Sequence, residues 1–303
     1  MHVAFVTAEG DHIRDEDVDR PFHEASFARR GIDLEYRYWT DPTVQWDAYD
    51  LVVIRSPWDY ATRSAEFLAW LDRVAGLGQL QNPAALIRWN LDKGYLLELE
   101  SRGVPVVRTV VAENIDQVAA ALNALGSTDA VIKPVVSAGS RLTGWFVADD
   151  PAALGLAHEI LTEGVKVIVE PFVSSVATVG EISAVFFDGA LSHCLRKGPI
   201  LEKGGGLIGG VYQENVSLHQ PTDVELDVAN SALRASTEIA RERDWLPDGA
   251  MPLYGRFDMV ELDDGTVALI EAELFEPSLF LSLSAGAEDL FTQACARRVE
   301  MLR

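Results

Sequence analysis

The chain has 303 residues, 48% of them hydrophobic, and is long enough for two or three compact units with sizeable cores. Its 47 acidic and 25 basic residues give a formal net charge of −22, which argues against a nucleic-acid surface or an anionic membrane as a partner. Its apolar stretches fall short of the ~18 residues that a membrane helix needs. Residues 1–7 predict a strand rather than a signal peptide. Cys194 and Cys295 lack metal-binding spacing, so we expect reduced thiols and a cytoplasmic location.

Strands and helices are expected to alternate along the first eighty residues, with strands at 3–7, 34–38 and 51–54 and helices at 17–30 and 64–75. This order is typical of a parallel α/β sheet. In such sheets ligands bind beyond the carboxyl ends of the strands. The polar and aromatic residues 55–60 are therefore candidates for a binding loop, and Arg55, Asp59 and Tyr60 for substrate contacts. A capped turn around a packing tryptophan is the alternative.

The rest of the chain predicts two further α/β pieces. A helix at 83–101 leads to a boundary at Gly103-Val104-Pro105. The next piece is expected to contain strands at 106–111, 130–133, 145–148 and 165–170 and helices at 115–125 and 151–163. The last third is expected to contain strands at 182–187, 190–196 and 212–217, a helix at 223–243, a hairpin and a closing helix at 287–302.

The hairpin near the C-terminus carries a cluster of charged side chains. Asp264-Gly265 predicts a tight two-residue turn, which places Asp258 opposite Glu271 and Arg256 opposite Glu273. All four side chains then stand on one face, with paired Cβ atoms only ~5 Å apart. Three carboxylates that close repel each other unless a cation lies among them. Mg²⁺ suits such oxygen ligands, and Mn²⁺ is an alternative. The simpler interpretation is a solvated acidic strand end.

Two lysines add to this pattern. Lys133 ends an apolar strand and is followed by a loop rich in small residues, including Ser137, Gly139 and Ser140. Small residues allow backbone amides to approach phosphate oxygens closely. Lys93 lies upstream on a predicted helix. Together with the carboxylates these features indicate a nucleotide–Mg²⁺ site, although a hairpin loop beside a surface lysine explains Lys133 equally well when it is taken alone.

Residues 204–209 have the spacing G-x-G-x-x-G, but a dinucleotide-binding loop must follow a strand and open a helix. Here Gly210 leads into a predicted strand, so we expect a mobile loop instead. Residues 204–210, flanked by Arg196, Lys197 and Lys203, are a candidate lid. The phosphate-loop, nucleophile-elbow, zinc-protease and C-x-x-C signatures do not occur in the sequence.

In this order the motifs resemble the ATP-grasp family. The resemblance runs from about residue 80 to the C-terminus and rests on these short segments: Asn90-Leu91-Asp92-Lys93, Val131-Ile132-Lys133-Pro134 with its small-residue loop, residues 167–173, Gly180-Glu181-Ile182-Ser183, Arg256-Phe257-Asp258 and Glu271-Ala272-Glu273. It implies an α+β grasp fold. A parallel α/β domain at 1–85 would precede a central grasp subdomain at 86–170 and a C-terminal grasp subdomain with the metal site at 171–303.

The resemblance also implies a role for each matching position. Contacts to ATP would come from Lys93, Lys133, Ser137, Gly139 and Ser140 at the phosphates, Glu170, Phe172 and Val173 at the adenine, and Glu181 at the ribose. Asp258, Glu271 and Glu273 would bind Mg²⁺, while Arg256 and Lys133 would act in catalysis. Two positions depart from the family pattern. Glu273 stands where many relatives have Asn, and Ser183 stands where peptide-ligating relatives often have Arg.

Residues 55–60 and 271–278 resemble a small-molecule branch of the family that includes cyclo-ligases acting on O-ureido-D-serine. This resemblance implies an ATP-dependent ligase that converts a carboxylate into an acyl phosphate, which a nitrogen nucleophile then attacks. The favoured reaction is the intramolecular cyclisation of O-ureido-D-serine to D-cycloserine. An intermolecular amino-acid or peptide ligase and a non-catalytic nucleotide-binding regulator are the alternatives. The expected partners are ATP and a small amino-acid-like substrate, and a homodimer stays open.

Overall fold

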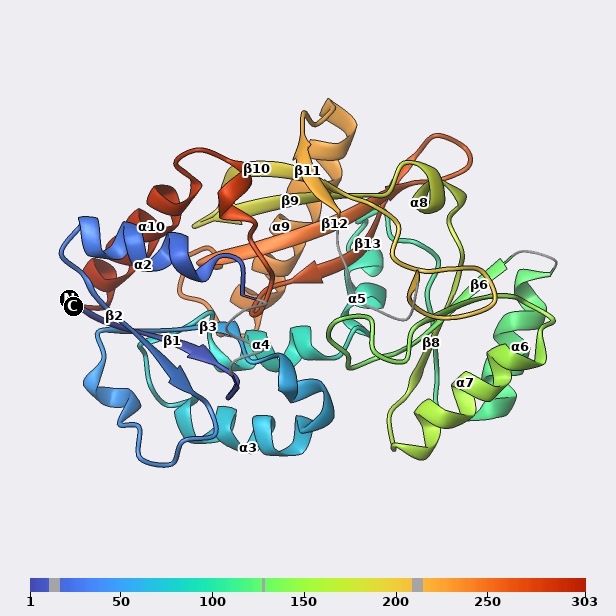
Figure 1. The fold of residues 1–303 in the computed structure, drawn as a ribbon, viewed down its shortest axis with the longest axis horizontal. Coiled ribbons are helices and arrows are strands. Elements are labelled where there is room, and N and C mark those ends of the chain that lie inside the picture. Colours follow the sequence, from blue (N-terminus) through green and yellow to red (C-terminus); the bar gives the residue numbers. More distant parts are fainter. Residues whose placement is uncertain (11–16, 127–128, 209–214) are drawn as a thin grey trace.

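The computed structural model describes residues 1–10, 17–126, 129–208 and 215–303, and its strands form three sheets. Figure 1 shows the first sheet and the central sheet at opposite ends of the molecule, with the C-terminal sheet across the top. None of the described helices is long and apolar enough to cross a membrane.

The first sheet is parallel, as predicted, with the order β2-β1-β3-β4. Its strands are β1 (His2–Thr7), β2 (Asp33–Tyr38), β3 (Leu51–Ser56) and β4 (Leu80–Gln81). The helices α2 (Arg20–Arg29) and α3 (Ser64–Val74) accompany it. The central strands β1 and β3 consist almost entirely of buried residues, which is why both read as short apolar runs in the sequence.

The central sheet is antiparallel and has the order β5-β8-β6-β7. Its strands are β5 (Val110–Ala112), β6 (Asp129–Pro134), β7 (Gly144–Val147) and β8 (Val167–Pro171), and α6 (Ile115–Leu125) and α7 (Pro151–Thr162) pack on it. The predicted strand at 106–111 is wrong in its first half. Val107 N instead donates to Leu269 O, because this segment runs along the edge of the C-terminal sheet.

The C-terminal sheet is antiparallel, with the order β11-β10-β9-β12-β13. Its strands are β9 (Glu181–Phe187), β10 (Ala190–Lys197), β11 (Val216–His219), β12 (Tyr254–Glu261) and β13 (Val267–Glu273). The short helix α8 (Ser174–Thr178) precedes it, and α9 (Asp223–Glu242) covers one face. Of the predicted strand at 212–217, residues 212–214 lie outside the described residues.

The single helix predicted at 83–101 is wrong. The chain forms α4 (Ala84–Leu91) and α5 (Tyr95–Ser101), separated by an extended Asp92. Asp92 Oδ1 accepts a hydrogen bond from Gly94 N at 2.8 Å, and Lys93 N donates to Val135 O at 2.9 Å. Tertiary contacts therefore override the helical pattern here. The interruption ties Lys93 to the central sheet.

The hydrophobic cores join segments that are distant in the sequence. The closing helix α10 (Ala287–Leu302) shares a core with α2 and the first sheet, and α4 and α5 share a core with α9. Asp50 binds both chain ends, because its carboxylate accepts from His2 N and Arg303 Nη2. The division of the chain at residues 85 and 170 stays a prediction, since packing crosses both positions.

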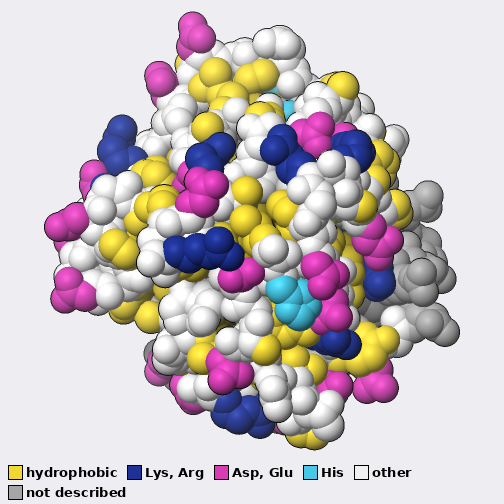
Figure 2. All heavy atoms as spheres, turned by 90° about the vertical axis from the view of Figure 1, so that its left-hand side faces the viewer, with side chains coloured by type: hydrophobic (Ala, Val, Ile, Leu, Met, Phe, Trp, Pro, Cys, Tyr) yellow, Lys and Arg dark blue, Asp and Glu magenta, His cyan; other side chains and the backbone are white. Residues whose placement is uncertain are grey.

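Charged side chains of both signs are mixed on the end of the molecule formed by β2, α2 and α10. Figure 2 shows basic and acidic groups interspersed there with hydrophobic ones. Arg29, for example, pairs with Asp289 at 2.8 Å across the contact between α2 and α10. Such exposed pairs are screened by solvent and contribute little, so the buried packing between these helices contributes more to their association.

The side chain of Asn82 joins the first sheet to the C-terminal sheet, and substituting it tests this connection. This fully buried side chain donates to Tyr254 O and Leu274 O and accepts from Leu253 N. We expect Asn82→Ala to lower the free energy of unfolding by about 2–4 kcal/mol, because three buried backbone groups lose their partners. Urea denaturation measures this loss. The exposed Asn123→Ala should stay within about 0.5 kcal/mol of the parent, and an equally small effect for Asn82→Ala would contradict the assignment.

The two cysteines are buried, and burial raises the pKa of Cys194 to about 11 and that of Cys295 to about 12. Raised pKa values lower the thiolate fraction, so at about pH 8 fewer than roughly one thiol in a hundred is ionised. We expect neither cysteine to react with Ellman's reagent within minutes in the native protein. Both should react at once in guanidinium chloride. Rapid reaction of the native protein would contradict the burial of these side chains.

Candidate active site

A cavity of about 730 Å³ lies where the three sheets approach one another. The first sheet contributes Trp58 and Asp59 from the loop after β3. Most of the charged lining comes from the other two sheets and from the segments next to them: Lys93, Lys133, Glu170, Glu181, Lys197, Arg256, Glu271, Glu273 and Glu276. The structure thus brings most of the site residues predicted from the sequence around one space.

The β12–β13 hairpin has the predicted pairing, in which Arg256 faces Glu273 and Asp258 faces Glu271. The predicted two-residue turn is nevertheless wrong. Leu262 N donates to Thr266 O, so the loop contains three residues, and Gly265 takes the left-handed conformation. A bulge at Ile270 then shifts the register back by one residue. The longer loop and the bulge cancel, which restores the expected facing pairs.

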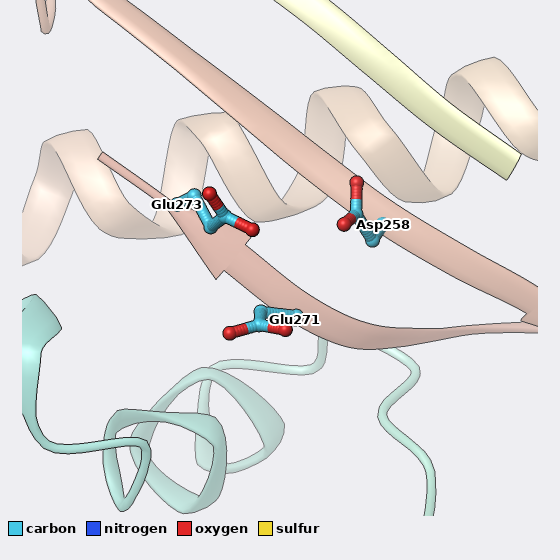
Figure 3. A group of neighbouring side chains, drawn as sticks. All are labelled: Asp258, Glu271 and Glu273. Carbon is cyan, nitrogen blue, oxygen red and sulfur yellow. The ribbon is translucent and has the colours of Figure 1, made fainter. Parts of the chain in front are cut away.

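The three carboxylates of the hairpin form one cluster. Asp258, Glu271 and Glu273 each offer an oxygen within 4.8 Å of the others (Figure 3). Asp258 projects from β12, and the two glutamates project from β13. A set of three carboxylate oxygens is the ligand chemistry that Mg²⁺ or Mn²⁺ takes, so these residues fit the predicted metal site.

Two cations hold Asp258, which is fully buried. Lys197 Nζ lies 2.7 Å from Asp258 Oδ2, and Arg256 Nη2 lies 2.9 Å from the same oxygen. Burial by itself raises the pKa of Asp258, but Arg256 and Lys197 hold it well below its ordinary value. Asp258 therefore stays ionised throughout the physiological range.

The two glutamates of the cluster differ in their electrostatics. Burial raises the pKa of Glu271, but two lysines outweigh this effect and lower the pKa below its ordinary value. They are Lys93, whose Nζ lies 3.1 Å from Glu271 Oε1, and Lys133. Burial instead dominates at Glu273 and raises its pKa well above the ordinary value, although Arg256 pairs with it. Such a carboxylate gains most from a further cation, because the added charge compensates for its loss of solvation.

Lys133 and Glu170 form a buried ion pair on neighbouring strands of the central sheet. Their Nζ and Oε2 atoms are 2.8 Å apart, and Thr109 Oγ1 donates to Glu170 Oε1 at 3.0 Å. Burial lowers the pKa of Lys133, but the carboxylates of Glu170 and Glu271 outweigh this and raise it. The ammonium group of Lys133 thus stays charged at the cavity wall.

Lys93 extends from the break between α4 and α5 to the small-residue loop. Its Nζ donates to Ser137 O at 3.0 Å as well as pairing with Glu271. Gly139 and Ser140, which line the cavity with Ser137, both have positive φ angles. This backbone conformation points amides of a short loop toward an anion more readily than an extended strand does.

The other end of the cavity is less charged. Phe172 and Val173 line it at the end of β8, and the Phe172 ring stacks on Trp145 with centroids 3.7 Å apart. Glu181 is linked to the metal cluster through Lys197, whose Nζ lies 3.0 Å from Glu181 Oε2 and 2.7 Å from Asp258 Oδ2. An apolar end next to a charged one suits a ligand that carries a ring and phosphates.

The predicted substrate residues are not equally placed. Asp59 lines the cavity and is held by Trp39 Nε1 at 2.7 Å. Arg55 and Tyr60 are buried behind the lining. Arg55 Nη2 donates to Pro277 O, and Tyr60 Oη donates to Glu276 Oε1. The strand-end rule therefore found the correct edge of the sheet, while direct substrate contact by these residues stays a prediction.

Sequence reasoning missed Glu276 and Ser278 and assigned Lys197 only to the flank of a lid. Glu276 and Ser278 line the cavity, and Lys197 lies between Glu181 and Asp258. One signal was available for Lys197, because it is one of only five lysines in an acidic chain. Glu276 was marked only by the resemblance of residues 271–278 to a small-molecule branch of the family, which assigned it no role.

Comparison with known proteins agrees with this geometry. A D-alanine–D-alanine ligase from Bacillus anthracis superposes over 100% of both chains with a TM-score of 0.70 at 12% identity. The crystal structure of D-cycloserine synthetase DcsG superposes over 99% of this chain and 100% of that one, with a TM-score of 0.90 at 33% identity. Residues 3–82 match the family model described as the N-terminal domain of D-cycloserine synthetase DcsG. The cycloserine biosynthesis protein DcsG of Streptomyces lavendulae is 38% identical over 280 residues, 89% of this chain and 90% of that protein.

The fold is that of the ATP-grasp ligases, as the sequence motifs predicted. The 38% identity to the Streptomyces lavendulae protein over most of both chains narrows the assignment from a fold to a single family. The chain belongs to the D-cycloserine synthetase (DcsG) family of these ligases.

Glu271→Gln tests the metal cluster, because it removes one charge with little change in shape. We expect Mn²⁺ affinity in the presence of ADP, measured by electron paramagnetic resonance, to fall at least about tenfold. Glu261→Gln is the matched control, since Glu261 is an exposed carboxylate on the same hairpin. Equal Mn²⁺ affinity for the two variants would contradict the metal assignment.

Proposed function

We propose that this enzyme uses Mg²⁺-ATP to convert the carboxylate of O-ureido-D-serine into an acyl phosphate, which the ureido nitrogen of the same molecule then attacks. The observation that carries the proposal is the convergence of Lys93, Lys133, Arg256 and the carboxylate cluster on one cavity. The names of its relatives support the substrate class, because they are a D-cycloserine synthetase and a cycloserine biosynthesis protein.

ATP fits the two ends of the cavity in one orientation. Its adenine would lie at the apolar end beside Phe172 and Val173, and its phosphates would lie near Lys93, Lys133 and the loop around Gly139. The D-alanine–D-alanine ligase of Bacillus anthracis has been solved as a complex with ATP. Its likeness in fold supports ATP as the nucleotide.

Mg²⁺ would be held by Asp258, Glu271 and Glu273, whose oxygens converge as this ion requires. When bound, it neutralises charge on the phosphates. The protein's own cations act at the same place. Lys93 and Lys133 would lie beside the phosphates of ATP. Arg256, which is fixed by a 2.9 Å hydrogen bond to Ser278 O, would lie beside the carboxylate of the substrate. Charges positioned in advance stabilise a phosphoryl transfer without reorganisation.

The ring closes in two stages, and both stages use a single organic substrate. A carboxylate oxygen attacks the γ-phosphorus of ATP, and ADP leaves. The ureido nitrogen then attacks the activated carbonyl and gives up its proton as phosphate leaves with the former carboxylate oxygen. The five-membered ring at first carries the carbamoyl group on nitrogen, and water must remove this group as carbamic acid, which decomposes to carbon dioxide and ammonia.

Intramolecular attack suits a cavity of about 730 Å³, because no second amine has to be bound beside ATP. Correct folding of a single substrate reaches effective molarities of ~10⁵ M or more.

An acyl phosphate must also be protected from water. The candidate lid at 204–210 is described as far as residue 208, and its first part pairs with the central sheet through Trp145 N and Gly205 O, 2.9 Å apart. Closure of this segment, a cytoplasmic location and a homodimer stay predictions.

The test incubates the purified enzyme with Mg²⁺-ATP and O-ureido-D-serine as the sole organic substrate. We expect one ADP for each D-cycloserine identified by mass spectrometry, without an added amine. Lys133→Met should lower the turnover number at least about a hundredfold while the fold is retained, because a charge at the phosphates is lost. ADP formation that requires a second amino acid would favour the intermolecular ligase. An absence of ADP formation from a folded, ATP-binding enzyme would reject this substrate.

A further inference from the structure

Glu276 is a cavity carboxylate for which the proposed reaction has so far supplied no role. Its side chain lines the cavity although the residue is only 8% exposed. Tyr60 Oη donates to Glu276 Oε1 at 2.6 Å. No described residue donates a hydrogen bond to Glu276 Oε2. Tyr60 therefore holds Oε1, and Oε2 is available to a ligand.

Every other carboxylate that lines the cavity has a protein cation beside it. The pairs within ion-pair distance are Asp59 with Arg63, Glu170 with Lys133, Glu181 with Lys197, Glu271 with Lys93, and Glu273 with Arg256. Among the described residues none forms an ion pair with Glu276. Burial raises the pKa of Glu276 to about 7, and the Tyr60 hydrogen bond and the more distant charges of Lys93 and Arg256 offset this only in part. A buried carboxylate of this kind is stabilised by a ligand that brings a positive charge.

The loop that carries Glu276 is fixed by the first sheet rather than by its own strand. Trp58 Nε1 donates to Glu276 O at 3.1 Å, and Arg55 Nη2 donates to Pro277 O at 2.8 Å. The buried Asp19 carboxylate accepts from Leu279 N and Leu281 N. These contacts fix the loop, and the Tyr60 hydrogen bond fixes the carboxylate, as a specific recognition group requires.

We propose that the Glu276 carboxylate binds the α-ammonium group of the amino-acid substrate and thereby selects α-amino acids over plain carboxylic acids. The inference rests on the proposed function. In an α-amino acid the ammonium and carboxylate groups are attached to the same carbon, so their binding groups must lie close together. Arg256, the proposed partner of the substrate carboxylate, donates to Ser278 O, two residues beyond Glu276 along the chain. Tyr60 acts as a positioning residue for the Glu276 carboxylate.

The test compares two substrates that differ only at the α-carbon. O-Ureido-D-serine carries the ammonium group, and 3-(ureidooxy)propanoic acid carries hydrogen in its place. The kcat/KM for ADP formation is measured with each substrate for the parent enzyme and for Glu276→Gln. The glutamine keeps an oxygen for the Tyr60 hydrogen bond but removes the charge. Glu261→Gln is again the control.

We expect the parent enzyme to prefer O-ureido-D-serine about 10- to 100-fold, because the desamino compound leaves Glu276 without its partner. Glu276→Gln should reduce this preference to about threefold or less by lowering kcat/KM for the amino acid, with the KM for ATP unchanged. Tyr60→Phe, which leaves the charge in place, should reduce the preference by a smaller factor. This second variant keeps the inference testable if Glu276→Gln folds poorly.

An unchanged preference in folded Glu276→Gln would overturn the role of Glu276 alone. An equal loss of kcat with both substrates would also overturn it, because that result indicates a proton acceptor rather than an ammonium site. Failure of the parent enzyme to turn over O-ureido-D-serine would overturn the proposed function together with this inference. The control Glu261→Gln should show the parent preference in each case.

Discussion

The site depends on the cost of holding three carboxylates, one buried and two half-buried, within 4.8 Å of one another. Like charges at that separation are stable only when cations accompany them. The cations come from separate parts of the chain, since Lys93 follows α4, Lys197 ends β10 and Arg256 lies on β12. The carboxylate cluster is therefore neutralised only when these segments have been brought together by the fold. This requirement links the assembly of the fold directly to the chemistry of the site.

Four carboxylates of the site, the cluster and Glu276, divide by their electrostatic surroundings. Asp258 and Glu271 have lowered pKa values, because lysine and arginine outweigh the effect of burial. Glu273 and Glu276 have raised values, because burial outweighs the nearby cations. The first pair stays charged without a ligand, whereas the second pair gains from charge that a ligand brings. A metal beside Glu273 and an ammonium group beside Glu276 satisfy both needs in neighbouring positions.

The sequence predicted which residues gather around the cavity more accurately than it predicted the backbone that carries them. The facing pairs of the hairpin were correct because the alternation of strand side chains is strict, yet the three-residue loop and the bulge at Ile270 were missed. The helix break before Lys93 was missed because its cause is a contact with Val135, more than forty residues away. Glu276 was missed for the same reason. Local patterns predict elements and registers, whereas long-range contacts decide which loops face the cavity.

The most direct test of carboxylate activation follows an oxygen atom. O-Ureido-D-serine labelled with ¹⁸O in both carboxylate positions is turned over with unlabelled ATP in unlabelled water, and the inorganic phosphate is examined by mass spectrometry. An acyl phosphate transfers one carboxylate oxygen to phosphorus, so the account predicts phosphate that carries a single ¹⁸O for each ring formed. Ring formation with unlabelled phosphate would contradict activation of the carboxylate by ATP.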